Sequence, residues 1–245
     1  MSTNKTLLLT AIIAIFLCSC SNRHYYLVAL QHAQNPTPDK VYDKLTEISH
    51  SNDQLIWKTI NGKQYVLVAT WTADTPAYNK IGKYDSSNGL WAYNTKDHKI
   101  WVTLDPYLKE EPYKNMSDKK LDMRLKQLIG LPPTSVYNYF LEVWVRPEDV
   151  VRPCFDPATN TNVCEFTPSE KDKLNITYSY WLYQYLYNSY SNPDRMKRYP
   201  FSHLGYTYDW NHKNRSHVGL SEFVIDSYKD VYVNRVYTTR QYFNN

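Results

Sequence analysis

The side chains with the greatest chemical potential gather near the C-terminal end of the chain, at His203, Asp209, His212, His217 and Glu222. Imidazole nitrogens and carboxylates are common zinc ligands, and a histidine beside a carboxylate can transfer protons near neutral pH. These residue types therefore permit two kinds of chemistry, namely metal binding and general acid–base catalysis.

The spacing of these residues matches no motif that would choose between the two chemistries. The sequence contains no His-Glu-x-x-His helix, no Gly-x-Ser-x-Gly turn, no phosphate-binding glycine loop and no dinucleotide fingerprint. We therefore expect neither a metal nor a cofactor. A structural interpretation also stays open, in which His212 and His217 are loop residues, Asp209 caps a turn and Glu222 faces solvent.

Glu222 stands out because it shares one face of the expected strand 218–225 with aliphatic residues. A carboxylate in that position is either a charge on an edge strand or a group held in a cleft by a partner such as Arg146 or Arg152. Both interpretations remain open at this point.

A catalytic hypothesis combines Glu222 with His203, Asp209 and Arg146 in an exported hydrolase or nucleotide-directed transferase. Some exported toxins that act on nucleotides also use a glutamate on one strand and an arginine on another. This likeness concerns residue types alone, so it assigns no activity.

Aromatic residues are abundant, with 24 tyrosines, seven tryptophans and seven phenylalanines among 245 residues. Tyrosine and tryptophan suit stacking on sugar rings or peptide side chains, but they also pack well at the boundary of a core. If they form a ligand surface, we expect it in segment 199–210, with Tyr206, Tyr208 and Trp210 contacting a glycan or a peptide. A core built from aromatic residues is the alternative.

Three strand pairs are expected from local patterns. Segments 55–60 and 63–72 flank Asn61-Gly62, which suits the positive φ angles of a type I′ turn. Segments 90–93 and 99–104 are expected to form a second hairpin, after an irregular stretch over 73–89. Segments 218–225 and 230–238 are expected to pair with each other at the end of the chain.

Helix signals occur at three places. Thr37-Pro38 predicts a helix that ends near Ser49, and Ser117 caps a helix that stops at Gly130. Thr167-Pro168-Ser169-Glu170 fits a capping box that opens a helix reaching about Tyr190. Two side-chain stripes follow on that helix, an inner one with Leu182 and an outer one with Tyr180, Tyr183, Tyr187 and Tyr190.

The order of these elements predicts an α+β fold, in which helices pack on a mostly antiparallel, twisted sheet. The strand over 139–146 is apolar on both faces, which is typical of a central strand. We expect one globular domain over 37–245, preceded by a tether with a short first element over 20–36.

The N-terminal residues carry the one resemblance to a known class. Lys5, an apolar stretch over 7–17 and the run Leu17-Cys18-Ser19-Cys20 resemble the signal peptide and lipobox of bacterial lipoprotein precursors. The resemblance implies cleavage of residues 1–19, acylation of Cys20 and attachment to a membrane in the cell envelope. Ser21 is not the aspartate of an inner-membrane retention signal, which favours the outer membrane. A plain signal peptide or an uncleaved anchor is the alternative.

Export to an oxidising compartment predicts that Cys154 and Cys164 form a disulfide across a loop rich in Pro, Asn and Thr. The formal net charge is only +4, and the 28 basic and 24 acidic residues are interspersed. This pattern argues against nucleic acid as a partner. The expected partners are the membrane, through the lipid anchor, and a glycan or peptide ligand. The sequence gives no signal for the oligomeric state.

Overall fold

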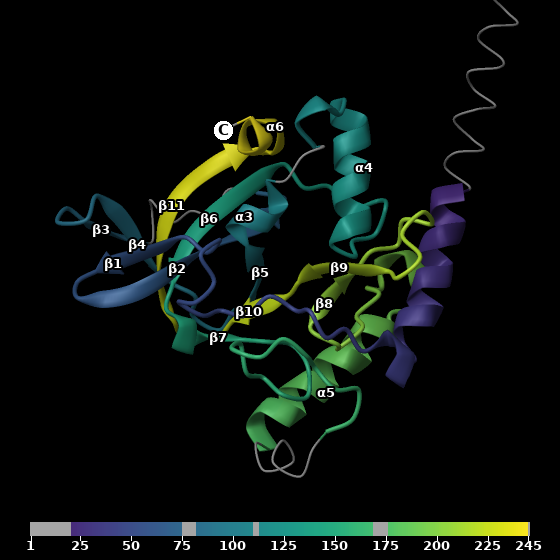
Figure 1. Cartoon of the computed structure of the whole chain (residues 1–245). Coiled ribbons are helices and arrows are strands. Elements are labelled where there is room, and N and C mark those ends of the chain that lie inside the picture. The colour runs from purple at the N-terminus through teal and green to yellow at the C-terminus, as the bar shows by residue number, and fades with distance from the viewer. Residues whose placement is uncertain (1–20, 75–81, 110–112, 169–175, 245) are drawn as a thin grey trace, which may run out of the picture.

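The fold is α+β, as predicted, in a computed structural model that describes residues 21–74, 82–109, 113–168 and 176–244. Within this part of the chain, nine strands form one antiparallel sheet in the order β3-β4-β11-β6-β2-β5-β10-β7, with β1 paired to β2. A short second sheet joins β8 and β9. Figure 1 shows the large sheet curving across the molecule, with the helices gathered toward one end.

The strands have the following bounds: β1 Trp57–Ile60, β2 Lys63–Thr72, β3 Lys83–Asp85, β4 Leu90–Asn94, β5 Ile100–Leu104, β6 Tyr139–Val145, β7 Val150–Val151, β8 Tyr206–Tyr208, β9 Val218–Ser221, β10 Phe223–Ile225 and β11 Asp230–Thr238. The helices are α3 Asp105–Leu108, α4 Asp118–Leu128, α5 Ile176–Ser191, α6 Thr239–Phe243 and one more over residues 21–33. Short 3-10 turns include η1 at Pro38–Lys40.

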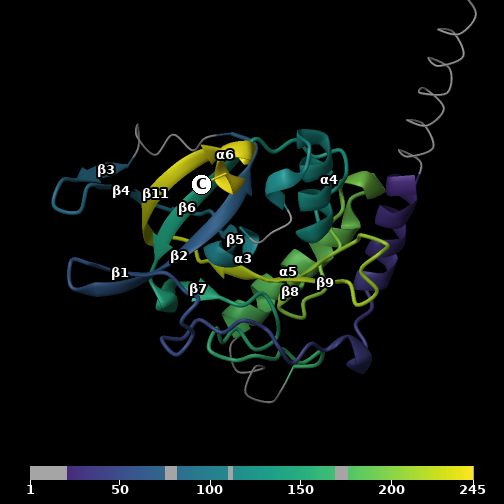
Figure 2. The same cartoon turned by 45° about the horizontal axis from the view of Figure 1, so that its top comes forward.

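Two views agree on where the helices lie. Helices α4, α5 and 21–33 occupy one end of the molecule, and the β1–β2 and β3–β4 hairpins occupy the opposite end (Figures 1 and 2). Helices α4 and α6 pack on β2 and β6 through a cluster that includes Leu121, Leu125 and Phe140. Helices 21–33 and α5 contribute to a separate aromatic-rich cluster around Tyr26 and Trp210. The middle of the molecule, between sheet and helices, is therefore enclosed by side chains from many elements.

Predictions that depend on local sequence are confirmed. The β1–β2 hairpin turns at Asn61 and Gly62, whose φ angles are 49° and 74°. Helix α4 begins after Ser117 and is followed by Gly130 with a φ of 70°, the left-handed conformation that glycine tolerates at a helix end. Strand β6 lies between β11 and β2, so it is a central strand.

Two of the expected strand pairings are wrong. Strands β4 and β5 exist, but β4 pairs with β3 and β11, while β5 pairs with β2 and β10. The closing strands do not pair with each other either, because β10 joins β5 and β7 whereas β11 joins β4 and β6. The irregular stretch over 73–89 also contains strand β3. Burial of both faces of the central strands favours these distant partners over neighbours in the sequence.

The N-terminal part of the domain also differs from expectation. A helix covers residues 21–33 where a tether with a short first element was predicted, and it buries Tyr26, Ala29, Leu30 and Ala33. The helix predicted from Pro38 to Ser49 is only the turn η1. Beyond it, the backbone N–H of Leu45 donates to Asn162 O and that of Ile48 to Thr159 O. Contacts with residues 154–164, here called the cysteine loop, therefore replace helical hydrogen bonds in this segment.

The predicted disulfide between Cys154 and Cys164 is confirmed. Beside it lies Arg152, which is fully buried and donates to the carbonyls of Thr46, Ala158, Thr161 and Gly205. Its guanidinium also lies 4.8 Å from the ring centroid of Phe223. Arg152 is therefore the centre of the loop structure and is not available to pair with Glu222.

Helix α5 confirms the two-stripe prediction in most respects. Leu182 is buried, whereas Tyr180, Tyr183 and Tyr187 are exposed. Tyr190, expected on the outer stripe, is buried because its hydroxyl donates to Phe201 O. The predicted capping-box residues Ser169 and Glu170 and the inner-stripe residue Leu174 lie outside the described residues.

Candidate functional site

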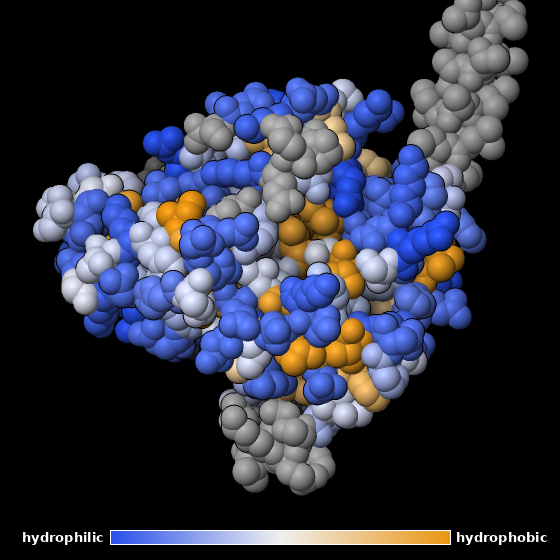
Figure 3. Space-filling view, viewed as in Figure 1, coloured by the Kyte–Doolittle hydropathy of each residue, from blue (hydrophilic) through white to orange (hydrophobic). Residues whose placement is uncertain are grey.

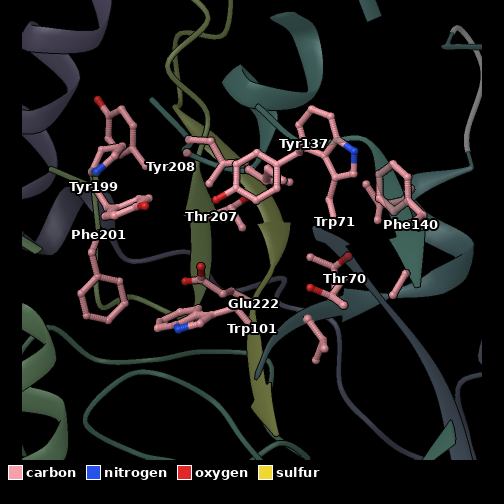
Figure 4. A pocket seen from close by; sticks show the side chains of 18 of the residues that line it. Thr70, Trp71, Trp101, Tyr137, Phe140, Tyr199, Phe201, Thr207, Tyr208 and Glu222 are labelled. Atoms are coloured by element: carbon pink, nitrogen blue, oxygen red, sulfur yellow. The ribbon is translucent and has the colours of Figure 1, made fainter. Parts of the chain in front are cut away.

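A cavity of about 290 Å³ lies between the large sheet, the end of α4 and helix α5. Its walls come from β2, β5, β6, β8, α5 and the segment 199–201, and Figure 4 shows the side chains that face it. Aromatic rings dominate this lining: Trp71, Trp101, Tyr137, Phe140, Tyr185, Tyr199, Phe201 and Tyr208. On the surface, apolar residues gather between the regions of α4 and α5 (Figure 3).

The rings form two groups on opposite sides of the cavity (Figure 4). In one group, the Trp101 centroid lies 4.6 Å from that of Tyr185 and 5.5 Å from that of Phe201. In the other group, Trp71 stacks on Tyr137 at 5.2 Å and on Phe140 at 5.8 Å. The rings of each group therefore pack on one another as well as facing the cavity.

Glu222 lies between these two groups, with its carboxyl group directed toward the open space (Figure 4). The chain changes sheets here, since β9 pairs with β8 and β10 pairs with β5, and the Glu222 N–H donates to Gly205 O between them. Within the described residues its carboxyl group has no hydrogen bond or ion pair, and burial raises its pKa to about 8. Glu222 therefore supplies the one carboxyl group in the described lining of the aromatic cavity.

Two threonine hydroxyls that line the cavity differ in how they are satisfied. Thr207 Oγ1 donates to Leu128 O at 2.7 Å and accepts from the Leu220 N–H at 2.8 Å. Thr103 Oγ1 is buried and lacks any hydrogen-bond partner in the described structure. A buried hydroxyl without a partner is costly, but the Thr103 oxygen has almost no accessible surface, so Glu222 is the polar group that a ligand in the cavity could contact.

Thr207 and Trp210, from segment 199–210, hold the C-terminal end of α4 against β8 and β9. Trp210 Nε1 donates to the carbonyls of Lys126 and Leu131, both at 3.0 Å. Gly219 allows the closest approach, because a Cβ there would lie 2.3 Å from Thr207 Oγ1 and 2.5 Å from Leu128 O. These contacts position Thr207, Tyr208 and Glu222 around the cavity.

The predicted catalytic residues have separate partners and do not form one constellation. Asp209 is buried, and its carboxylate accepts hydrogen bonds from Arg124 Nη1 and Nη2 at 3.0 and 2.8 Å. Arg146 binds Asp149 at 2.7 Å, which removes it as a partner for Glu222. His203 is buried beside Phe155 and Phe201, and burial lowers its pKa to about 4. Of the predicted set, Glu222 alone lines the cavity.

The remaining histidines hold the first helix in place. The ring of His212 stacks on Tyr25 at 4.5 Å, and His217 stacks on Tyr208 at 4.9 Å. His32 Nδ1 lies 2.5 Å from the Tyr208 hydroxyl, which joins helix 21–33 to a cavity residue. Among the described residues, no group of three or more His, Cys, Asp or Glu side chains is placed to hold a metal ion.

Only some of the aromatic residues predicted to contact a ligand face the cavity. Tyr206 and Trp210 are buried, at 3% and 1% exposure, so neither presents a surface to a ligand. Tyr208 does line the cavity, as do Tyr199 and Phe201 from the same segment. The sequence reasoning missed the rings that complete the site: Trp71, Trp101, Tyr137, Phe140 and Tyr185.

A second buried polar cluster is self-contained. Lys109 Nζ lies 2.7 Å from Glu142 Oε1 and 3.3 Å from Asp105 Oδ2. The Tyr242 hydroxyl donates to Asp105, and Asn234 Nδ2 donates to Glu142. Because every carboxylate here has partners of its own, the cluster serves the packing of β6, β11 and α6 rather than a ligand.

Two further results bear on classification. Comparison of the chain with protein-family models, curated proteins and solved structures gives no match. In the part of the chain that the structure describes, no helix has the length and apolar character needed to cross a bilayer.

Proposed function

We propose that the protein is a lipid-anchored binding protein of the bacterial cell envelope, and that the aromatic cavity around Glu222 is its ligand site. The observation that carries the proposal is a cavity lined by eight aromatic residues, with one carboxyl group that has no partner in the described chain. Enclosed, mostly aromatic cavities with a few polar groups are typical of small-molecule sites.

The size of the cavity limits what can enter. At about 290 Å³ it holds a small molecule, or one ring or side chain of a larger glycan or peptide. The aromatic side chains supply apolar contact, and the Glu222 carboxyl group supplies the polar contact that fixes orientation. This division of roles is why the site suits a ligand with an apolar body and one polar group.

The catalytic alternative lacks a second reactive group. Acid–base hydrolysis of a glycoside uses two carboxyl groups, and the described lining of the cavity contains one. Neither His203 nor Asp209, which were expected to assist Glu222, lines the cavity, and Asp209 is bound to Arg124. Binding therefore accounts for more of the site than turnover does.

Placement in the envelope rests on the lipobox-like sequence ending at Cys20 and is supported by the disulfide between Cys154 and Cys164. Disulfides form in oxidising compartments, which agrees with export. The proposed anchor also places the domain next to a membrane, and it requires no spanning helix in the mature protein.

The proposal is tested with a library of small aromatic and amphipathic compounds, monosaccharides and dipeptides, by NMR of the tryptophan indole N–H signals. A ligand should shift the Trp71 and Trp101 signals. Tyr199→Ala, which removes a partly exposed ring from the cavity, should weaken binding, whereas Tyr180→Ala, which removes an exposed ring from α5, should not. Compound-dependent hydrolysis abolished by Glu222→Gln, without stable binding, would support the enzyme instead.

A further inference from the structure

The charge of the cavity is one-sided. Its described lining contains Glu222 and no lysine, arginine or histidine, so nothing there would stabilise an anionic ligand. Three basic groups of neighbouring segments bind carboxylates outside the cavity: Arg124 binds Asp209, Lys109 binds Glu142 and Lys99 binds Asp226. A ligand that enters the site meets one carboxyl group and several ring faces.

Ring faces attract positive charge. The face of an aromatic ring carries negative electrostatic potential, so a cation near tryptophan or tyrosine is stabilised, most strongly where water is excluded. The Trp101, Tyr185 and Phe201 rings form one group, and the Trp71, Tyr137 and Phe140 rings form another. In Figure 4 the Glu222 carboxyl group lies between Trp101 and Phe201 of the first group and Trp71 and Tyr137 of the second. This arrangement favours an ammonium group over a neutral group of the same shape.

From this juxtaposition of two ring clusters and an unpartnered carboxyl group, we propose that the cavity binds an organic cation, with an alkylammonium group against Glu222 and its apolar part against the rings. The inference rests on the proposed function, because it names the ligand class of the same site.

Binding of a cation should be coupled to loss of the Glu222 proton. Burial raises the Glu222 pKa to about 8, so at pH 7 the empty cavity holds mostly the neutral acid. The other titratable groups that face the cavity are tyrosines from α5, β8 and two loops: Tyr185, Tyr208, Tyr137 and Tyr199. Burial raises the pKa of Tyr137 to about 12 and moves those of Tyr185 and Tyr208 further upward, so these three stay neutral throughout.

The test uses a pair of probes that differ in charge and share one shape, phenyltrimethylammonium and tert-butylbenzene. Isothermal titration of the full folded domain in buffers of different ionisation enthalpy measures affinity and proton release together. The cation should bind at least tenfold more tightly than the neutral probe at pH 9. At pH 7 it should release close to one proton per site, since the Glu222 pKa is about 8.

The pH profile gives a readout that needs no variant. Affinity for the cation should rise almost tenfold per pH unit from pH 6 to 7.5 and level off above pH 9, whereas affinity for the neutral probe should stay flat. Glu222→Gln should remove the slope, the proton release and the advantage of the cation. Glu165→Gln, which removes the same charge from an exposed position on the cysteine loop, should change none of them.

Each result separates the two levels of the proposal. If the neutral probe binds as tightly as the cation at every pH, or if Glu222→Gln leaves the cation affinity unchanged, the cation inference is wrong while the binding site stands. If neither probe nor any compound of the library shifts the Trp71 and Trp101 signals, the proposed function itself is contradicted.

Discussion

The indole of Trp210 donates its N–H to the carbonyl of Lys126 at 3.0 Å, and this contact joins the segment after β8 to the last turn of α4. Trp210 is 1% exposed and also packs edge-on against Tyr26 at 5.5 Å. A residue that the sequence suggested as a ligand contact is therefore a structural link between α4, β8 and helix 21–33.

Trp210→Ala should lower the free energy of unfolding by about 3 to 5 kcal/mol, because it leaves a large cavity and two carbonyls without their donor. Urea denaturation followed by circular dichroism measures this change. Tyr199→Ala is the matched control, because that ring is partly exposed at the cavity and its loss should cost stability far less. Equal stability of the Trp210 variant and the wild type would contradict the structural role.

Glu222 should destabilise the empty protein at alkaline pH. Its pKa is about 8 in the folded state against 4.5 as the reference, so the unfolded chain binds fewer protons between these values. Stability is therefore lost as pH rises through this window. Glu222→Gln should raise the free energy of unfolding by roughly 3 to 5 kcal/mol at pH 9 and change it little at pH 4, as measured by urea titration at both pH values. A destabilising Gln variant at pH 9 would show that the carboxylate has an ionic partner.

His203 should act in the opposite pH range. Burial lowers its pKa to about 4 from 6.5, so the unfolded chain binds more protons between these values and stability falls as pH drops through them. The loss should reach about 3 kcal/mol at pH 4. His203→Asn does not titrate and tolerates the left-handed backbone at this position, where φ is 46°. The variant should show a flatter acid limb, and an unchanged limb would refute this origin.

Reduction of the Cys154–Cys164 bond should lower stability by about 2 to 3 kcal/mol, because the bond closes a short loop in the unfolded chain. The loop also holds segment 45–48 through its Asn162 and Thr159 carbonyls. Hydrogen exchange should therefore quicken at Leu45 and Ile48 in the Cys154→Ser/Cys164→Ser variant, while β6 keeps its protection. Loss of protection at β6 as well would mean that the loop is required for the whole sheet.

Cys20→Ala should abolish incorporation of labelled fatty acid and release the protein from the membrane fraction of a bacterial host. Cys18→Ala is the control, because Cys18 lies within the predicted signal peptide and carries no lipid in this hypothesis. Continued labelling of the Cys20 variant would overturn the lipoprotein assignment.

The sequence predicted those elements whose signals are local. Asn61-Gly62 and Gly130 dictate a turn and a helix end through their own backbone preferences, and both were found as expected. The partners of strands were not predictable in this way. Asn94 on β4 bonds to Asp230 on β11, 136 positions away, and no local pattern favours that pairing over the neighbouring strand β5.

Only some of the residues that line the cavity could be predicted from the sequence, for the same reason. Glu222 was recognisable because a carboxylate among aliphatic residues is unusual, and the aromatic excess pointed to segment 199–210. Trp101 and Tyr185 carry no such local signal, because their meeting at 4.6 Å depends on the tertiary fold. Neither Arg146 nor Arg152 pairs with Glu222, because Arg146 binds Asp149 and Arg152 binds backbone carbonyls.

Ser21, the residue after Cys20, already lies in the described helix over residues 21–33, which Tyr25, Tyr26 and His32 hold to the domain. A flexible linker over residues 20–36 would let the domain move about 20 Å from its attachment point. With lipid on Cys20, the packed helix leaves no such slack, so the domain would stand at one height and tilt above the bilayer. Partners embedded in the same leaflet would then meet the same side of the protein.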